Sequence, residues 1–341
     1  MAAEECRKQL CQSMSQIGAR TNAADRVLIL SGGVDTCAIL AAAMETNVAF
    51  AAAITVITSE DSPDRPFAAA AAAEHTLPHH IVFMTTGDLV ERHLPACVNI
   101  LKTFDGMTLR NSLVVAAAMQ KASELGFKHA IVGDGADELL GGYSFMWKAK
   151  DAAEWKEKRD SMVSKWSFAT SDLAAAHGLT SHSPYMEPDF VAWAIASAQM
   201  ENCIGVRQIQ LELDGERIEH ETGKIVLREA FATLSSWRRK DPIEVGSGAT
   251  VIGHDDFWAQ LIPDAAFDDE KRDAAARGFQ IKNKEHLANF RAFEHAFGRD
   301  GVKHPKARTV GQGCLGCCFE LPLGEMFCHV CGAYPAQKTG A

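Results

Sequence analysis

The stretch of sequence that decides the fold is RVLILSGGVD, residues 26–35, followed at once by TCAILAAAM. An apolar run, two glycines and an alanine-rich run predict a strand, a tight turn and a helix, the repeating unit of a parallel α/β sheet. Glycines let backbone N–H groups approach an anion closely, and the start of a helix adds a positive partial charge. The sequence therefore predicts an anion-binding loop at residues 31–36.

The alternation of strands and helices continues beyond this loop. Apolar runs at residues 48–58, 80–84 and 129–132 predict three further strands, with helices between them. From residue 143 to residue 295 the signals are mostly helical. We therefore expect an α/β fold with a doubly wound parallel sheet and a helical C-terminal half.

Three segments are predicted along the chain. Residues 1–22 are polar with helical spacing and predict an N-terminal helix, and residues 23–302 form the main domain. The basic, proline-containing segment 304–310 is interpreted as a linker within a C-terminal module of residues 303–341.

Composition narrows the class of protein. The 341 residues are 47% hydrophobic and 23% charged, which excludes a wholly disordered chain. The formal net charge of −10 disfavours a broad surface for polyanions. No apolar run reaches the roughly 18 residues that a membrane span needs. The N-terminus, MAAEECRKQL, is unlike a signal peptide, so we expect a soluble, cytoplasmic protein with no membrane partner.

Two features of the glycine loop specify its chemistry. No lysine follows it, so it differs from the GxxxxGK[ST] phosphate loop. The hydroxyls of Ser31 and Thr36 can donate hydrogen bonds, whereas Asp35 would repel phosphate unless a divalent cation lies between them. This combination predicts magnesium, and the alternative is a tight turn without a ligand.

The loop and a second segment resemble a known family. SGGVDT at residues 31–36 resembles the SGGxDS/T loop of the PP-loop (N-type) ATP pyrophosphatases, and VGDGADELLGGY at residues 132–143 resembles the SGEGxDExxGGY segment of asparagine synthetases. The resemblance covers about residues 5–300 and implies an adenine nucleotide alpha hydrolase-like fold. Further segments follow in the same order: SPD at 62–64, SPYME at 183–187, GKIVLREAF at 223–231 and RRKDP at 238–242.

The resemblance implies a set of site residues. Asp35 and Asp137 are expected to hold Mg²⁺, and Lys240 to neutralise charge on the α-phosphate and the leaving pyrophosphate. Arg110 is a weaker candidate for a phosphate contact. The expected ATP and pyrophosphate contacts are Leu30, Ser31, Gly32, Gly33, Asp35, Thr36, Ile57, Gly133 and Lys240.

The sequence departs from asparagine synthetases at two places. Ala2 follows Met1 where the family's glutaminase domain has a cysteine, so we expect the chain to lack its own glutaminase. Asp134 stands where asparagine synthetases have a glutamate, and Glu187 stands where the related β-lactam synthetases place a carboxylate. Asp134 and Glu187 are therefore competing candidates for the catalytic base, and Asp134 has the alternative role of orienting the substrate amine.

The C-terminal module contains two pairs of cysteines. Cys314, Cys317, Cys328 and Cys331 form two CxxC pairs, a spacing that predicts a tetrahedral structural Zn²⁺ site in a small zinc-ribbon module. Cys318 follows Cys317 directly, so the spacing leaves open which of the two is the ligand. A redox pair and an iron–sulfur cluster are the alternatives.

Three functions are compatible with these motifs. The first is an AMP-forming ligase that uses ATP to adenylate a small carboxylate substrate and joins it to ammonia or an amine. An ammonia- or sulfur-donating protein is its candidate partner. The second is a PP-loop sulfur transferase with Cys97 and Cys203 as its catalytic pair, whose nucleic acid substrate the mildly basic C-terminal module would contact. The third is a nucleotide-binding scaffold without activity. The segment at residues 132–143 favours the ligase, with ATP, Mg²⁺ and Zn²⁺ as cofactors.

Overall fold

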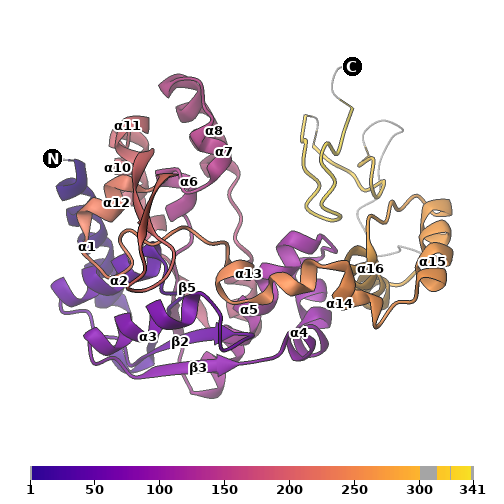
Figure 1. The fold of residues 1–341 in the computed structure, drawn as a ribbon, viewed down its shortest axis with the longest axis horizontal. Helices are drawn as coiled ribbons and strands as arrows, with labels where there is room; N and C mark the ends of the chain where they lie inside the picture. Colours follow the sequence, from indigo (N-terminus) through magenta and orange to yellow (C-terminus); the bar gives the residue numbers. More distant parts are fainter. Residues whose placement is uncertain (1, 300–312, 323, 339–341) are drawn as a thin grey trace. The chain divides into compact units, whose positions relative to one another are not determined.

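The structure is a computed structural model that describes residues 2–299, 313–322 and 324–338 (Figure 1). The predicted linker at residues 304–310 lies outside the described residues. The chain divides into two units, which we describe separately: unit 1 comprises Met1–Phe83 and Ala118–Ser247, and unit 2 comprises Met84–Ala117 and Gly248–Ala341. The domain boundaries expected after residues 22 and 302 stay a prediction.

Unit 1 is built on a five-stranded parallel sheet with the strand order β3-β2-β1-β4-β5. The strands are β1 (Arg26–Ile29), β2 (Ala52–Ile57), β3 (His79–Phe83), β4 (His129–Ile131) and β5 (Thr180–His182). The chain builds outward from β1 to β3 and then returns to add β4 on the other side of β1. This order confirms the predicted doubly wound sheet, and it places a topological switch point between β1 and β4, where such sheets bind ligands.

The register of the central strands brings two loops together. Leu28 of β1 pairs with Ala53 of β2 and with Ile131 of β4. Because parallel strands end at the same edge of a sheet, the loop after β1 and the loop after β4 begin side by side.

Helices and the sheet bury a common core. Helix α1 (Ala2–Arg20) buries Leu10, Met14 and Ile17, which lie on one face, and packs against α2 (Val34–Glu45). The other helical elements of unit 1 are η1 (Ala23–Asp25), α3 (Asp64–Glu74), α6 (Ala136–Leu140), α7 (Ser144–Trp147), α8 (Ala152–Lys165), α9 (Ala169–Ala176), η2 (Pro184–Met186), α10 (Pro188–Ser197), α11 (Met200–Cys203), α12 (Ile225–Ala230) and α13 (Ile243–Gly246).

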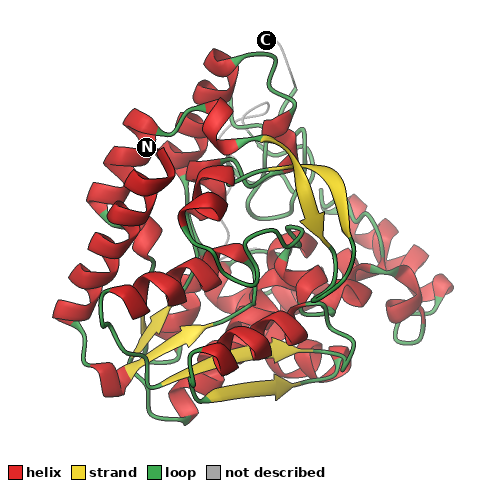
Figure 2. Ribbon diagram, turned by 60° about the vertical axis from the view of Figure 1, so that its left-hand side comes forward, coloured by secondary structure: helices red, strands yellow, loops and turns green. Residues whose placement is uncertain are grey.

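The predicted helical half contains strands that the sequence did not reveal. Strand β5 closes the sheet, and β6 (Gly205–Gln210) pairs with β7 (Arg217–Thr222) as an antiparallel hairpin. Figure 2 shows this hairpin as a long, twisted pair of arrows set apart from the parallel sheet. Its second strand leads directly into the residues before α12.

Unit 2 consists of helices and the cysteine-rich segment. Its helical elements are α4 (Thr86–Leu101), the first part of α5 (Gly106–Glu124), η3 (Ala249–Gly253), α14 (Asp255–Ala259), α15 (Asp264–Ala276) and α16 (Lys284–Phe297). Phe104 lies at the centre of its core, with ring centroids 5.2 Å from Phe290 and 5.1 Å from Phe293. Across the described residues of both units, none of the helices combines the length and apolarity needed to cross a membrane.

Candidate active site

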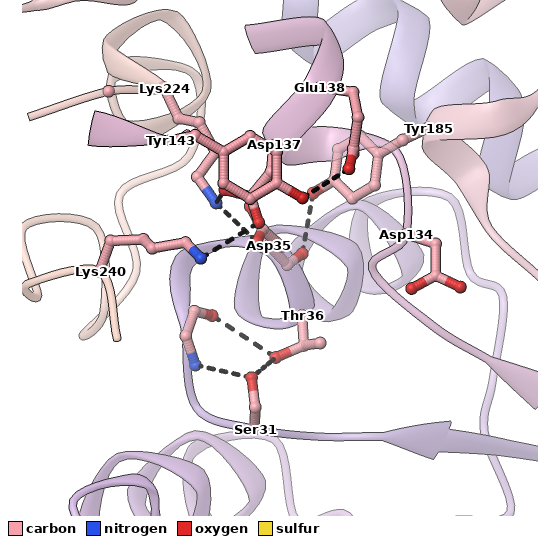
Figure 3. A network of polar contacts seen from close by, with 12 residues as sticks. Ser31, Asp35, Thr36, Asp134, Asp137, Glu138, Tyr143, Tyr185, Lys224 and Lys240 are labelled. Atoms are coloured by element: carbon pink, nitrogen blue, oxygen red, sulfur yellow. Dashed lines mark hydrogen bonds and ion pairs between the residues drawn. The ribbon is translucent and has the colours of Figure 1, made fainter. Parts of the chain in front are cut away.

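The glycine loop follows β1 as predicted. Gly32 has a φ of +69°, and a Cβ there would lie 2.4 Å from the backbone nitrogen of Ala68, so only glycine fits. Ser31 Oγ accepts a hydrogen bond from the Gly33 N–H (3.2 Å) and lies 3.2 Å from Thr36 Oγ1 (Figure 3). The loop thus collects backbone and hydroxyl donors at the start of α2.

Two aspartates meet at the switch point between β1 and β4. Asp35 lies in the first turn of α2 and Asp137 in the first turn of α6. Lys224 Nζ lies 2.7 Å from Asp35 Oδ2 and 2.8 Å from Asp137 Oδ1. The two residues expected to hold magnesium are therefore close enough to share one cation.

The lysine that joins the aspartates was not among the predicted site residues. Lys224 is 1% exposed and has a φ of +59°, a left-handed backbone that is uncommon for a residue with a side chain. The sequence contained one signal for it, because a lone cation directly precedes the apolar run Ile225–Leu227.

Lys240, expected to neutralise charge on the phosphates, lies at the same cluster. Its Nζ is 3.4 Å from Asp137 Oδ2 and 5.4 Å from the centroid of the Tyr143 ring. Figure 3 shows Lys224 and Lys240 approaching the two aspartates from neighbouring segments. Two cations and two carboxylates thus gather beside the glycine loop.

Close packing fixes the Asp137 carboxylate. A Cβ at Gly142 would lie 1.7 Å from Asp137 Oδ1, so the carboxylate occupies the space that any other residue would fill. On the other side of the cluster, a Cβ at Gly133 would lie 3.1 Å from Asp35 Cβ. The glycines of the segment at residues 132–143 therefore serve to bring the two carboxylates together.

Electrostatics differ between the two aspartates. Burial alone would raise the pKa of Asp137, but Lys224 and Lys240 outweigh it and lower that pKa to about 2. Burial raises the pKa of Asp35, and the charge of Asp137 adds to this effect against the opposing charge of Lys224. Burial would lower the pKa of Lys224, yet the two carboxylates raise it. Lys224 is therefore a charged ammonium at neutral pH.

The carboxylates also suit a divalent cation. Asp35 Oδ1 is buried and has no hydrogen-bond partner among the residues that the structure describes. A carboxylate oxygen left in this state is costly, and hard oxygen ligands are those that Mg²⁺ prefers. Asp35 and Asp137 thus fit the predicted magnesium site by donor type.

The two candidate bases have different surroundings. Both oxygens of Glu187 contact the guanidinium of Arg20, with Oε2 2.8 Å from Nη1. Burial raises the pKa of Asp134 to about 6, although a hydrogen bond from Thr170 opposes the shift. The hydroxyl of Ser183 donates to the Asp134 backbone oxygen (2.6 Å). Figure 3 shows the Asp134 carboxylate apart from the lysine–aspartate cluster.

Three predicted residues lie outside this cluster. The side chains of Leu30 and Ile57 are buried at the ends of β1 and β2, so only their backbone atoms are left to contact a nucleotide. Arg110 belongs to unit 2, where its Nη1 lies 2.8 Å from Glu285 Oε2. The phosphate contact suggested for Arg110 remains a prediction.

Four of the C-terminal cysteines form a separate candidate metal centre. The sulfur atoms of Cys314, Cys317, Cys328 and Cys331 lie within 4.8 Å of one another, and all four residues are buried. Four converging thiols match the donor set of structural zinc. Cys318 instead is exposed, and its Sγ lies 3.4 Å from the Gly278 carbonyl oxygen. The geometry therefore selects Cys317 over Cys318.

The cysteines proposed for sulfur transfer are buried thiols. Burial raises the pKa of both Cys97 and Cys203 to about 12. A thiol with such a pKa stays protonated near neutral pH and is a poor nucleophile. This finding disfavours the sulfur transferase.

The parallel sheet, its glycine loop and the paired aspartates define a domain of the PP-loop ATP pyrophosphatase class. The asparagine synthase family matches residues 20–167. Residues 20–167 therefore form an asparagine synthase domain.

Curated relatives agree with this assignment. Asparagine synthetase [glutamine-hydrolyzing] 1 from Saccharomyces cerevisiae is 25% identical over 66% of this chain and 40% of its own length. Asparagine synthetase B [glutamine-hydrolyzing] from Escherichia coli is 25% identical over 56% of this chain and 33% of its own length. The chain thus spans less than half the length of these relatives.

Among solved structures, an NH3-dependent NAD synthetase from Campylobacter jejuni aligns with 59% of this chain and 95% of its own. The sequence identity is 15% and the TM-score is 0.31, a similarity too weak to support a conclusion.

Proposed function

We propose that this protein is an ATP-dependent, AMP-forming ligase that adenylates a substrate carboxylate, releases pyrophosphate and forms an amide with ammonia or an amine. The observation that carries the proposal is Lys224, held between Asp35 and Asp137 beside the glycine loop. A fixed pair of carboxylates with a buried ammonium and a second lysine suits the binding of a metal-complexed polyphosphate.

In the first step, an oxygen of the substrate carboxylate attacks the α-phosphorus of ATP, and the bond to pyrophosphate breaks. Donors of the loop, from Ser31 to Thr36, hold the leaving pyrophosphate, and Lys240 neutralises the charge that develops there. When bound by Asp35 and Asp137, Mg²⁺ supplies further neutralisation of the triphosphate. Lys224 keeps the two carboxylates from repelling each other.

In the second step, the amine nitrogen bonds to the acyl carbon, the bond from that carbon to AMP breaks, and the nitrogen loses a proton. We assign this proton to Asp134, because a pKa of about 6 leaves it ionised but basic near neutral pH. Glu187 is the weaker candidate, because Arg20 binds both of its oxygens.

The chain also offers a zinc site and features that bear on its cellular compartment and nitrogen source. We assign structural Zn²⁺ to the four clustered cysteines of unit 2. The ten cysteines of the chain form no disulfide, which supports a reducing compartment such as the cytoplasm. Ammonia, supplied free or by a partner protein, is the proposed nitrogen source.

The test is Mg²⁺-dependent pyrophosphate release from ATP, measured with a panel of amino acids plus ammonium. We expect release with at least one acid, and loss of it in Asp137→Asn. The matched control is Asp189→Asn, because Asp189 is an exposed aspartate whose carboxylate accepts hydrogen bonds from Gln12 and Gln16 of α1. Pyrophosphate release in Asp137→Asn equal to that of Asp189→Asn would overturn the proposal, as would no release with any acid.

A further inference from the structure

A buried arginine connects the segments that carry the two lysines. Arg228 lies in α12 and is 2% exposed. Its Nε donates to the carbonyl oxygen of Gly223 (2.9 Å), and its Nη1 donates to those of Ser236 and Arg238 (both 2.8 Å). All three acceptors are backbone atoms outside the helix.

These carbonyl groups stand next to the lysines in the chain. Gly223 directly precedes Lys224, and Arg238 lies two residues before Lys240. The guanidinium of Arg228 therefore bonds to the backbone one residue before Lys224 and two residues before Lys240. A displacement of either segment would change the distance between the ammonium groups at the aspartate pair.

The segments that carry Lys224 and Lys240 need this connection through Arg228, because neither is regular secondary structure. Lys224 has a left-handed backbone, and a Cβ at Gly223 would lie 1.9 Å from the carbonyl oxygen of Gly141. The segment from Phe231 to Lys240 consists of turns and coil, apart from an isolated β-bridge between Arg238 and Gln210. Among the residues that the structure describes, its backbone bonds to the hairpin at Gln210, which pairs with Trp237 and Arg239.

The hydrogen bonds of Arg228 continue to the glycine loop through Arg238. While the Arg238 carbonyl accepts from Arg228, the Arg238 guanidinium lies 3.3 Å from the Ser31 carbonyl oxygen and 2.7 Å from Asp64 Oδ1. The contacts thus run from the backbone at Lys224, through two arginines, to the start of the phosphate-binding loop.

Burying the charge of Arg228 is energetically unfavourable, which indicates that the guanidinium has a specific role. Burial lowers the pKa of Arg228 to about 10 against the opposing charges of Asp35 and Asp137, and its guanidinium bonds to backbone carbonyls instead of pairing directly with a carboxylate. A buried cation that forms no direct ion pair is destabilising, and packing alone would not offset this effect. A planar guanidinium donates in several fixed directions at once, which lysine and apolar side chains cannot do.

We propose that Arg228 is a positioning residue that holds the Lys224 and Lys240 segments at a fixed spacing around the aspartate pair. This inference rests on the proposed function, because it assigns the spacing to stabilisation of charge on the reacting phosphates. Arg228 acts through the lysines and touches no substrate.

The first experiment compares Arg228→Lys with Arg159→Lys. Arg159 is a matched control, because it is 1% exposed and donates to three backbone carbonyls, those of Ala194 and Ile195 in α10 and of its C-cap Ala198. It also contacts the neighbouring Asp160 carboxylate (2.9 Å). We expect Arg228→Lys to lower kcat for pyrophosphate release on the order of 10- to 100-fold with KM for ATP changed less than about 3-fold. Arg159→Lys should lower the melting temperature without lowering kcat.

A double variant separates positioning from general destabilisation. If Arg228 acts through Lys240, Arg228→Lys should cost much less kcat in a Lys240→Ala background than in the wild type. Full additivity of the two losses, or a loss in Arg228→Lys no larger than that in Arg159→Lys, would overturn the proposal.

Chemical rescue provides a second variant. A cavity of about 660 Å³ is lined by Arg228, Ser236 and the β6–β7 turn, and it offers small solutes a route to this position. Guanidinium at a sub-denaturing concentration should raise kcat of Arg228→Ala several-fold and leave Arg159→Ala unchanged. Equal responses of the two variants would contradict a positioning role.

Two measurements test the role of Arg228 if the wild type shows no turnover or if the Arg228 variants do not fold. If the wild type releases no pyrophosphate, the proposed function falls, and a crystal structure of Arg228→Lys still tests the positioning role. The Nζ atoms of Lys224 and Lys240 should be displaced relative to each other in Arg228→Lys but not in Arg159→Lys, and an unchanged spacing refutes it. If no Arg228 variant folds, a crystal structure of the wild type with Mg²⁺ and a non-hydrolysable ATP analogue replaces them. Arg228 bonded to the carbonyls of Gly223 and Arg238 supports the proposal, and loss of either bond overturns it.

Discussion

The lysine–aspartate cluster of unit 1 and the cysteine cluster of unit 2 are both suited to metal, but their construction is opposite. The aspartate side chains are about one-fifth exposed (21% for Asp35 and 20% for Asp137) and share a lysine. The four cysteines are buried and converge on one point. Partly open oxygen ligands leave room for a substrate, whereas four thiolates complete a closed site. The first cluster therefore points to chemistry and the second to stability.

Hydrogen bonds connect the cysteine cluster to the rest of unit 2. The carbonyl oxygen of Val330, between the last two cysteine ligands, accepts hydrogen bonds from the Phe104 N–H (2.7 Å) and the Thr103 hydroxyl (3.1 Å). Lys282 Nζ donates to the carbonyl oxygen of Gly332 (2.7 Å). The described residues of the cysteine-rich segment are thus bonded into unit 2.

The largest effect is expected for Lys224→Met. Removing the buried ammonium leaves the Asp35 and Asp137 carboxylates facing each other, so turnover should fall by roughly 1,000-fold and stability by about 3 kcal/mol or more. Pyrophosphate release and urea unfolding measure the two losses. Wild-type turnover in this variant would show that the cluster of unit 1 is structural, like that of unit 2.

The next effect concerns the metal of unit 2. Cys328→Ser should abolish binding of one Zn²⁺ per chain and lower the melting temperature of unit 2, because a structural zinc site contributes directly to folding. Metal analysis and calorimetry measure these changes. Pyrophosphate release assayed below the melting transition should stay near the wild-type rate. A variant that retains its zinc would refute the assignment of this site.

A pH profile separates the two half-reactions. Burial raises the pKa of Asp134 to about 6, so amide formation should fall as the pH drops below about 6, where this base becomes protonated. Because the pKa is raised on folding, protonation of Asp134 stabilises the protein, and the stability it contributes is lost as the pH rises through about 6. The acidic loss of activity would therefore not reflect unfolding by this group.

Asp134→Asn supplies the control for this profile. It should abolish amide formation and leave ATP–pyrophosphate exchange intact, since the base acts only after adenylation. Asp64, whose pKa burial also raises to about 6, would instead affect both half-reactions through its contact with Arg238. If exchange and amide formation fell together in Asp134→Asn, this carboxylate would have a role in binding and not as the base.

The smallest effect is expected for Cys318→Ser. Its sulfur lies outside the group of four, so zinc content and melting temperature should match those of the wild type. Metal analysis beside Cys328→Ser makes the comparison direct. A loss of zinc in Cys318→Ser would mean that the two adjacent cysteines exchange roles.

Much of this arrangement was predictable because local patterns encode it. The apolar run before Ser31 and the glycines after it specify a strand and a turn, and the segment at residues 132–143 places Asp137 at the end of a neighbouring strand. Strand β5 was missed because Thr180–His182 is short and polar, and its pairing with β4 is long-range.

The assignments that failed or stayed open depend on tertiary contacts. Nothing in the spacing of residues 223–240 indicates that Lys224 bridges the aspartates, because the bridge depends on how α12 packs against α1 and α2. The choice between Cys317 and Cys318 likewise follows from a φ of +61° at Cys318, which directs its side chain away from the other sulfurs. Such backbone conformations leave little trace in a single sequence.

The most direct test of the central claim is transfer of ¹⁸O from substrate to nucleotide. The protein is incubated with ATP, Mg²⁺, ammonium and a mixture of amino acids labelled with ¹⁸O in their carboxyl groups, and the products are analysed by mass spectrometry. Attack of the carboxylate on the α-phosphorus predicts AMP that carries one ¹⁸O and unlabelled pyrophosphate. Formation of ADP with ¹⁸O-labelled phosphate, or of AMP without the label, would contradict it.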